Sequence, residues 1–422
     1  MRGPVSRTGT AAHRRATGVA AAAAAALLLG ACSSGGTAIS PLGTPKAKPP
    51  TASAPASGGA TSAGATPSGP ASGDADGNSD ASATPSAAPA KGTAKVTGTV
   101  ATGLHSPWGV AQLPDGALLV ASRDTGTISR VDPDKGTTTE VGVVPGVTHT
   151  QGGEGGLLGL AVSPTFGSDQ LVYAYFTTES DNRIVRMLYD PSRAQGEQLG
   201  APDTILRGIP RGTIHNGGRI AFGPDGMLYA GTGETGQRQL AQDINSLGGK
   251  ILRMTPDGQP PQDNPVSGSL VYSPGHRNVQ GLAWDAAGHL WASEFGQDTW
   301  DELNLIEAGK NYGWPVAEGI AHNPAYVDPI AQWHTDQASP SGIAYAAGSI
   351  WMASLKGERL WRIPLKGTTA AAPPQSFLTS TYGRLRTVVA LDDHTLLLTT
   401  SNTDNRGTPK PGDDRILRVS VT

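Results

Sequence analysis

From residue 95 onward, apolar residues form short runs separated by polar turns, and no helical period of 3.6 residues is sustained. The first unit contains an apolar run and a Pro-Asp-Gly turn at 109–116, a second run at 117–122 and a third at 126–131. Asp-Gly turns between apolar runs of this length indicate antiparallel hairpins. The pattern therefore predicts a unit of three β-strands.

This unit occurs six times along the chain. Its copies begin at residues 109, 159, 219, 281, 342 and 387, at spacings of 50, 60, 62, 61 and 45 residues. Repeats of this length are typical of solenoids and β-propellers, and a propeller protects the edges of its small sheets by arranging them radially. Six copies predict an all-β, six-bladed β-propeller, in which residues 95–101 add a strand that closes the ring against the last blade. A pair of β-sandwiches is the alternative, but it does not explain the sixfold recurrence.

The first 31 residues have the features of an export signal. Four arginines within the first 15 residues precede an uninterrupted apolar run at 19–29. That run is too short for a stable membrane span but suits the core of a signal peptide. The sequence Leu-Gly-Ala-Cys at 29–32 resembles the lipobox of bacterial lipoproteins, which implies that Cys32 is lipidated and anchors the protein at the outer face of the cytoplasmic membrane. A buried core cysteine is the alternative reading of Cys32.

Residues 33–92 consist almost entirely of Ala, Ser, Gly, Thr and Pro, and their only large aliphatic residues are Ile39 and Leu42. Such a segment cannot bury enough apolar surface to offset the entropy lost on ordering it. The predicted organisation is therefore a signal peptide at 1–31, a lipidated cysteine and disordered linker at 32–94, and the propeller at 95–422.

Charge and cysteine content argue against several classes of protein. Charged residues make up 16% of the chain and the net charge is −3, so the chain lacks the basic surplus of a nucleic-acid binder. One cysteine excludes a disulfide scaffold, thiolate metal sites and iron–sulfur clusters. The sequence also has no Gly-x-Ser-x-Gly, His-Glu-x-x-His, P-loop or dinucleotide-binding glycine motif. We therefore expect neither a nucleic-acid partner nor a nicotinamide-dependent enzyme.

Several segments interrupt the repeat, and loops of this kind usually carry function. They are Glu-Gly-Gly-Leu-Leu-Gly at 154–159, His-Asn-Gly-Gly-Arg at 215–219, the stretch 275–306, Ser-Leu-Lys at 354–356 and Tyr-Gly-Arg-Leu-Arg at 382–386. In this order on six β repeats, they resemble the soluble quinoprotein glucose/sorbosone dehydrogenases, including the periplasmic aldose sugar dehydrogenases. The resemblance covers about residues 100–420, is most specific at 275–314, and implies a propeller that binds pyrroloquinoline quinone through calcium and oxidises sugars.

The resemblance also implies a set of cofactor contacts. A planar tricarboxylate such as this quinone requires cations and hydrogen-bond donors around it. The residues that match the cofactor site are Glu154, Arg277, Asn278, Lys356, Arg384 and Arg386. Arg384 and Arg386 are two residues apart near the start of a strand, so both point to one side of the chain. For each basic residue, a solvated surface charge is the alternative interpretation.

Two calcium sites are implied by the same resemblance. The active-site calcium is bound partly by backbone carbonyls of the loop that matches Gly296 and Gln297, and calcium accepts such oxygen ligands readily. Gln297 replaces a proline of the better-known members, but a carbonyl ligand does not depend on the side chain. A second, structural calcium of some members matches Glu302 and Tyr312, for which a surface carboxylate and a packed aromatic ring are the alternative.

Oxidation of a sugar hydroxyl requires a base, and His215 matches the base of the family. A structural histidine is the alternative. Ile214 replaces a carboxylate that precedes the base in some members, and Glu154 replaces a glutamine, so the sugar specificity is not carried over. Trp333 is the residue that matches a substrate-stacking aromatic, in a loop that aligns poorly.

The leading hypothesis is an extracytoplasmic, quinone- and calcium-dependent enzyme that oxidises aldoses at C1 to lactones and passes electrons to an acceptor that the sequence does not identify. A non-catalytic propeller that binds a glycan or protein at the cell surface is one alternative. A calcium-dependent propeller lactonase is another, and it requires several Asp, Asn or Glu ligands facing the channel. The basic residues Arg277, Arg384 and Arg386 favour an anionic cofactor over the lactonase.

Overall fold

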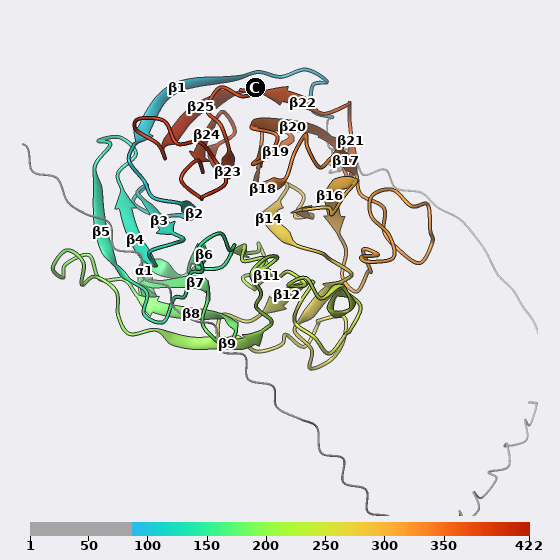
Figure 1. Cartoon of the computed structure of the whole chain (residues 1–422), viewed down its shortest axis with the longest axis horizontal. Helices are drawn as coiled ribbons and strands as arrows, with labels where there is room; N and C mark the ends of the chain where they lie inside the picture. The colour runs from blue at the N-terminus through green and yellow to red at the C-terminus, as the bar shows by residue number, and fades with distance from the viewer. Residues whose placement is uncertain (1–86) are drawn as a thin grey trace, which may run out of the picture. The chain divides into compact units, whose positions relative to one another are not determined.

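The computed structural model describes residues 87–422, which form six antiparallel sheets arranged in a ring (Figure 1). Each sheet is one blade. The first strand in the chain lies nearest the centre of the ring in five blades, and in the blade that contains both ends of the described chain β23 (Leu385–Asp392) is innermost and β1 (Ala94–Ala101) outermost. This arrangement confirms the predicted six-bladed β-propeller. The predicted signal peptide, Cys32 and most of the predicted linker lie outside the described residues.

The strands of each blade are as follows. Blade 1 contains β2 (Pro107–Gln112), β3 (Leu118–Ser122), β4 (Thr127–Val131) and β5 (Thr138–Val143). Blade 2 contains β6 (Leu157–Val162), β7 (Leu171–Thr177), β8 (Asn182–Leu188) and β9 (Asp203–Ile209). Blade 3 contains β10 (Ile220–Phe222), β11 (Leu228–Gly231), β12 (Lys250–Met254) and β13 (Val271–Pro274).

The second half of the ring follows the same order. Blade 4 contains β14 (Val279–Trp284), β15 (Leu290–Glu294), β16 (Trp300–Ile306) and β17 (Ala331–His334). Blade 5 contains β18 (Pro340–Ala346), β19 (Ser349–Ser354) and β20 (Arg359–Lys366), and β20 pairs with both β21 (Thr369–Ala370) and β22 (Gln375–Phe377). Blade 6 contains β23 (Leu385–Asp392), β24 (Thr395–Thr400), β25 (Ile416–Val421) and β1 (Ala94–Ala101).

The ring is closed by β1, which pairs antiparallel with β25 from Ala94↔Val421 to Ala101↔Ile416. The closing strand predicted at 95–101 is therefore confirmed. The linker predicted to reach residue 94 ends earlier, because the Ala88 N–H donates to the Leu365 carbonyl (2.9 Å) and Arg362 Nη2 donates to the Pro89 carbonyl (2.9 Å). These contacts attach residues 88 and 89 to blade 5.

The sequence analysis predicted three strands per unit, whereas each blade has a fourth, outer strand. The outer strands are short or largely exposed: β5 has four exposed residues out of six. An edge strand with one solvated face carries a weak apolar pattern, so the sequence did not reveal the outer strands of blades 1 to 5; the outer strand of blade 6 is the predicted closing strand β1. The described residues also contain α1 (Phe166–Asp169) and the 3₁₀-helix η1 (Arg238–Ala241), and neither is long enough to cross a membrane.

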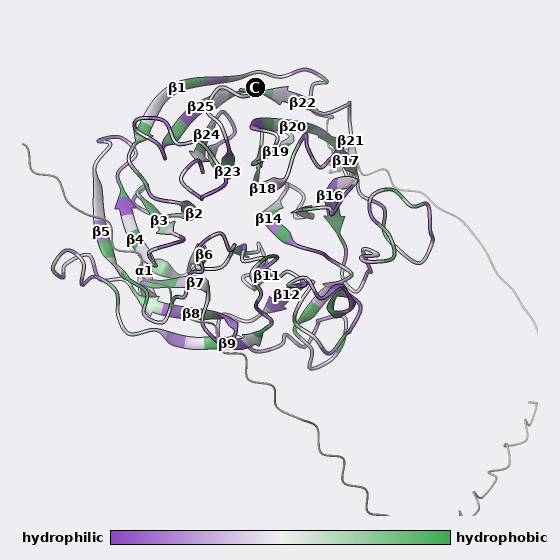
Figure 2. Ribbon diagram, viewed as in Figure 1, coloured by the Kyte–Doolittle hydropathy of each residue, from purple (hydrophilic) through white to green (hydrophobic). Residues whose placement is uncertain are grey.

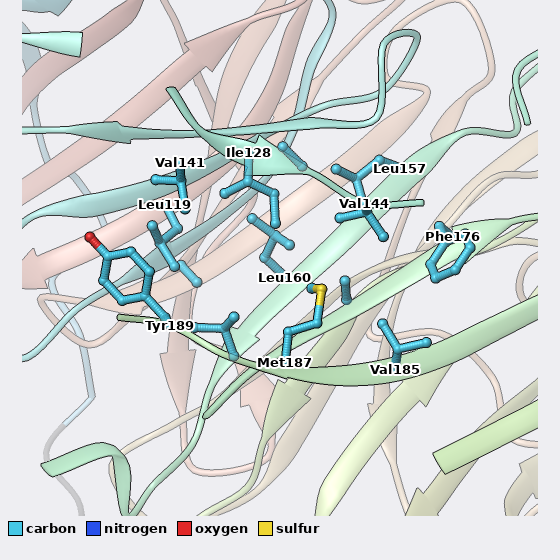
Figure 3. Close-up of a cluster of buried hydrophobic side chains, with 14 of the residues drawn as sticks. Leu119, Ile128, Val141, Val144, Leu157, Leu160, Phe176, Val185, Met187 and Tyr189 are labelled. Atoms are coloured by element: carbon cyan, nitrogen blue, oxygen red, sulfur yellow. The ribbon is translucent and has the colours of Figure 1, made fainter. Parts of the chain in front are cut away.

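The core of the described residues consists of six hydrophobic clusters, each packed mainly between two neighbouring blades; the cluster between blades 2 and 3 also includes Trp108 of blade 1. In β3, Leu119 and Ala121 pack toward blade 2, while Leu118 and Val120 pack toward blade 6. Alternate residues of a strand face opposite sides, so a strand covered on both faces is apolar along its whole length. Figure 3 shows the cluster between blades 1 and 2 around Leu160 and Met187, and Figure 2 shows hydrophobic residues distributed over all six sheets.

Candidate active site

The segments that interrupt the repeat meet at one end of the ring, around a cavity of about 180 Å³. They precede the first strand of a blade or connect its second and third strands. The cavity is lined by Trp108, Arg123, Glu154, Gln280, Phe295, Ser339, Leu355, Lys356, Arg384, Arg386, Asp404 and Arg406. Four residues predicted from the sequence, Glu154, Lys356, Arg384 and Arg386, are therefore brought together from blades 2, 5 and 6.

The lining of this cavity is strongly cationic. Among the described residues that line it, five are basic and two are acidic, a formal surplus of three positive charges. A cluster of like charges is unfavourable in the absence of compensation. The geometry is therefore that of a site for an anion with several negative groups.

Asp404 holds the two arginines of blade 6. Its Oδ2 accepts from Arg384 Nε (3.1 Å) and Nη2 (3.0 Å) and lies 3.4 Å from Arg386 Nη2. Arg386 also donates to Ser401 Oγ (3.1 Å) and to Gln280 Oε1 (3.2 Å). Burial lowers the pKa of Arg386 to about 10, and Asp404 opposes that shift, so the guanidinium is a cation at neutral pH.

His215 is paired with a carboxylate that the sequence analysis did not identify. Its Nδ1 lies 2.5 Å from Glu234 Oε1, and both side chains are almost fully buried. A carboxylate only accepts hydrogen bonds, so Nδ1 of the neutral ring carries the proton and Nε2 keeps its lone pair. The His215 N–H donates to Glu154 Oε2 (2.7 Å), which links the histidine to the cavity lining.

The His-Asn-Gly-Gly-Arg motif folds tightly beside blade 2. Gly217 and Gly218 have φ of +61° and +109°, and a Cβ at Gly218 would lie 2.6 Å from the Leu158 side chain. Glycine is required at these positions because a side chain would be both strained and in collision. Arg219, which ends the motif, lies 4.3 Å from the ring centre of Trp108 and donates to the Gln280 carbonyl (2.8 Å). The motif therefore supports the floor of the cavity.

Arg277 and Asn278 lie beside the cavity at the start of blade 4. Arg277 Nη1 donates to the Phe295 carbonyl (3.3 Å), and Asn278 Oδ1 accepts from the Gly217 N–H (2.9 Å). Within residues 87–422, Arg277 Nε and Asn278 Nδ2 are buried without a hydrogen-bond partner. Buried donors are normally satisfied, so these two are available for a bound group.

The loop between β15 and β16 carries the predicted calcium-binding carbonyls of Gly296 and Gln297. Phe295, next to them, lines the cavity. In the described part of the chain, neither carbonyl accepts a hydrogen bond from protein. Two free carbonyls beside an anion site fit the oxygen ligands that calcium prefers. No group of three or more His, Cys, Asp or Glu side chains among residues 87–422 is arranged to hold a metal, but a carbonyl site does not require one.

The side chains of Glu302 and Tyr312 are engaged with protein. Glu302 accepts hydrogen bonds from the Gly319 N–H (2.6 Å) and from Asn304 Nδ2 (3.0 Å). Its pKa is raised to about 8, mainly because the carboxyl group is buried and secondly because the negative charge of Glu294 lies nearby. The Tyr312 hydroxyl donates to the Leu305 carbonyl (2.6 Å), and its ring stacks on His276 at 4.7 Å. Tyr312 therefore packs as an aromatic residue, and Glu302 is a buried rather than a surface carboxylate.

Trp333 does not lie at the cavity. It belongs to the outer strand β17, where it is buried between blades 4 and 5 and packs 5.6 Å from the ring of Trp361. The prediction that it stacks on a substrate is therefore not supported by its position, because the poor alignment of its loop concealed a core strand. Ile214, beside His215, is 37% exposed.

Sequence reasoning missed several residues of this region, among them Trp108, Arg123, Glu234, Asp404 and Arg406. Glu234 and Asp404 are single carboxylates in polar loops, with no local pattern that distinguishes them from solvated acids. Trp108 immediately precedes the first copy of the repeat and resembles a core residue. Only the ring closure brings Trp108 of blade 1 next to Arg386 of blade 6, 5.6 Å away.

Residues 104–409 match the family model described as Glucose / Sorbosone dehydrogenase. The fold is similar to the structure of the quinone-bound aldose sugar dehydrogenase from Streptomyces coelicolor, with 68% sequence identity and a TM-score of 0.79 over 80% of this chain and all of that one. It is also similar to a glucose dehydrogenase from Thermus thermophilus, described as a putative oxidoreductase, with 42% identity and a TM-score of 0.69 over 78% of this chain and all of that one.

Two curated proteins are similar in sequence. Quinoprotein glucose dehydrogenase B from Acinetobacter calcoaceticus is 32% identical over 283 residues, which are 59% of each chain. The aldose sugar dehydrogenase YliI from Escherichia coli is 34% identical over 268 residues, 57% of this chain and 71% of the relative. The match thus spans less than two thirds of the Acinetobacter protein.

Proposed function

Because this chain belongs to the glucose/sorbosone dehydrogenase family, we propose that it oxidises aldose sugars at C1 to lactones with pyrroloquinoline quinone and calcium. The observation that carries the proposal is the buried His215–Glu234 pair, which is linked through Glu154 to a cavity with a surplus of three positive charges. A base next to an anion site suits the oxidation of a neutral sugar by a negatively charged cofactor.

The residues of the cavity fit the quinone. Its three carboxylates would be attracted by the basic residues that predominate in the lining, and the buried donors of Arg277 and Asn278 have no partner among the described residues. Lys356, Arg384 and Arg386 would hold the carboxylates, and the carbonyls of Gly296 and Gln297 would hold calcium. When bound, the quinone would supply the hydride acceptor for the oxidation, and calcium would supply a Lewis acid beside it.

The protein supplies the base and its orientation. Oxidation of the sugar removes the C1 hydrogen as hydride and the C1 hydroxyl proton as H⁺, and His215 Nε2 accepts that proton. Glu234 fixes the tautomer through Nδ1 and stabilises the imidazolium that forms. Glu154 holds the backbone of His215, whose φ is +54°, and so fixes the position of the ring.

Reconstitution of the purified full-length protein tests this proposal. The protein is stripped of metal with a chelator, and reduction of a dye is then followed with each of several aldoses, with quinone and calcium supplied together or singly. We expect aldose-dependent dye reduction that requires both. Tight quinone binding without oxidation of any aldose would favour the non-catalytic propeller, and quinone-independent hydrolysis of a lactone would favour the lactonase.

We further propose that the protein is exported and anchored by a lipid on Cys32, an assignment that rests on the sequence and falls outside the described residues. Cys32→Ser removes the thiol that would be lipidated, so the variant should move from the membrane to the soluble fraction. The propeller should keep its melting temperature, because residue 32 lies far in sequence from the strands that form the core. Metabolic labelling with a fatty-acid analogue checks the assignment, and an unlabelled wild-type protein would contradict it.

A further inference from the structure

The loop that carries Gly296 and Gln297 is folded around one carboxylate oxygen. Glu318 Oε1 accepts from four consecutive backbone N–H groups: Gln297 (2.8 Å), Asp298 (3.1 Å), Thr299 (2.9 Å) and Trp300 (3.0 Å). Successive N–H groups that converge in this way form a concave anion-binding nest. Here a side chain of the same protein, 18 to 21 residues further along the chain, fills the nest.

The orientation of two carbonyls follows from these hydrogen bonds. In a trans peptide, the C=O of one residue and the N–H of the next point in opposite directions, and both peptides concerned are trans. The N–H of Gln297 points at Glu318, so the Gly296 carbonyl points away from it. The N–H of Asp298 also points at Glu318, so the Gln297 carbonyl points away as well.

The loop at 296–300 is tightly packed, so the positions of its carbonyls are fixed. A Cβ at Gly296 would lie 1.9 Å from the Trp300 carbonyl oxygen and 2.8 Å from Glu318 Oε1. Asp301 fixes the other side of the loop, because its Oδ1 accepts from the Gly296 N–H (2.9 Å) and its Oδ2 from the Ser339 N–H (2.6 Å). Every N–H from residue 296 to residue 300 is thus held by a carboxylate, while no hydrogen bond within residues 87–422 is donated to the carbonyls of Gly296 and Gln297.

Hydrogen bonding to an anion also affects the carbonyls electronically. An N–H that donates to a carboxylate polarises its peptide group and increases the negative charge on the carbonyl oxygen of the same unit. A more negative oxygen is a better ligand for a hard cation such as calcium. Glu318 thus orients both carbonyls and strengthens them as ligands.

We propose that Glu318 is a positioning residue for the calcium site, which it builds by turning the Gly296 and Gln297 carbonyls toward the cation. This inference rests on the proposed function, because that function places calcium on these carbonyls. It predicts that calcium affinity depends on the Glu318 carboxylate, although Glu318 does not itself bind the metal.

Glu318→Gln provides the test, because glutamine keeps the size and one acceptor oxygen but loses the charge. Loss of a residue that orients metal ligands commonly lowers metal affinity about 10–100-fold, and we expect a loss in this range. The affinity is measured by calorimetric titration of calcium into chelator-treated, quinone-saturated full-length protein. The calcium-induced rise in melting temperature gives a second readout, and it should shrink in the variant.

Asp328→Asn is the matched control. Asp328 also accepts from loop backbone N–H groups, those of Ala321 (2.8 Å) and His322 (3.1 and 3.2 Å), but it does not contact residues 296–300. The calcium affinity of the Asp328→Asn variant should equal that of the wild type. An equal loss in Asp328→Asn would mean that any disturbance of this loop region weakens the site, and would overturn the role of Glu318.

The outcomes separate this inference from the proposed function. If the wild type binds no calcium under these conditions, the calcium site of the proposed function is wrong. If the wild type binds calcium and Glu318→Gln binds it equally well, the positioning role is wrong and the proposed function stands. Should Glu318→Gln not fold, Glu318→Asp keeps the charge on a side chain one methylene shorter, and wild-type affinity in that variant would overturn the positioning role.

Discussion

His215→Gln should lower turnover by about 10²–10⁴, which is the usual contribution of a general base. Glutamine has a similar volume and can still bond to Glu234, but it has no lone pair that can take a proton at neutral pH. Quinone and calcium affinity should change little, because Lys356, Arg384 and the Gly296–Gln297 carbonyls are untouched. Turnover per folded molecule and quinone affinity are measured on the same preparation.

The same substitution at a histidine outside the site, His394→Gln, is the control for this experiment. His394 is exposed in the turn between β23 and β24, and His394→Gln should turn over at the wild-type rate. If His215→Gln binds the quinone normally and oxidises aldoses as fast as the wild type, His215 is not the base. A loss of melting temperature with unchanged turnover would assign it a purely structural role.

Arg384→Ala should weaken quinone binding by about 1.5–3 kcal/mol, the value of a hydrogen bond to a charged group, or roughly 10- to 150-fold in affinity. The fold should survive, because Asp404 keeps Arg386 (3.4 Å), the Ser401 hydroxyl (3.2 Å) and the Arg406 N–H (3.0 Å) as partners. Titration with the quinone, followed by its absorbance or by calorimetry, measures the loss.

Arg418→Ala is the control for charge. Arg418 belongs to β25 and donates to the Pro133 carbonyl (3.0 Å) and to Asp134 (3.2 Å), away from the cavity lining. The Arg418→Ala substitution removes one positive charge, as Arg384→Ala does, but it leaves every cavity residue in place, so quinone affinity should be unchanged. Identical titration curves for wild type and Arg384→Ala would contradict the assigned cofactor site.

Local features of the sequence determined the fold. An apolar run followed by an Asp-Gly turn specifies a hairpin within about ten residues, and six such units specify six blades. The runs are continuously apolar because both faces of a strand such as β3 are covered by neighbouring blades. The outer strands of blades 1 to 5 escaped detection, because a half-exposed strand such as β5 carries little apolar signal.

The sequence also identified the residues that break the repeat, and the structure brings Glu154, Lys356, Arg384 and Arg386 to one cavity. The tertiary structure alone decided their partners. Glu234 meets His215 across 19 residues, Asp404 meets Arg384 across 20, and Glu318 meets the loop at 297–300 across 18 to 21.

No local pattern marks those three carboxylates, because an acidic residue in a loop is the same in sequence whether it faces water or a buried partner. Trp333 gives the converse case: an aromatic residue near an uncertain loop suggested a substrate contact, but strand pairing with β16 places it in the core. Each hairpin depends on hydrogen bonds and burial that residues close together in the chain specify. The sequence by itself therefore determined the six-bladed ring. The charge pairing that builds the site joins loops of the same blade that lie 18 to 21 residues apart in the chain, and only the tertiary structure decided which of their side chains meet.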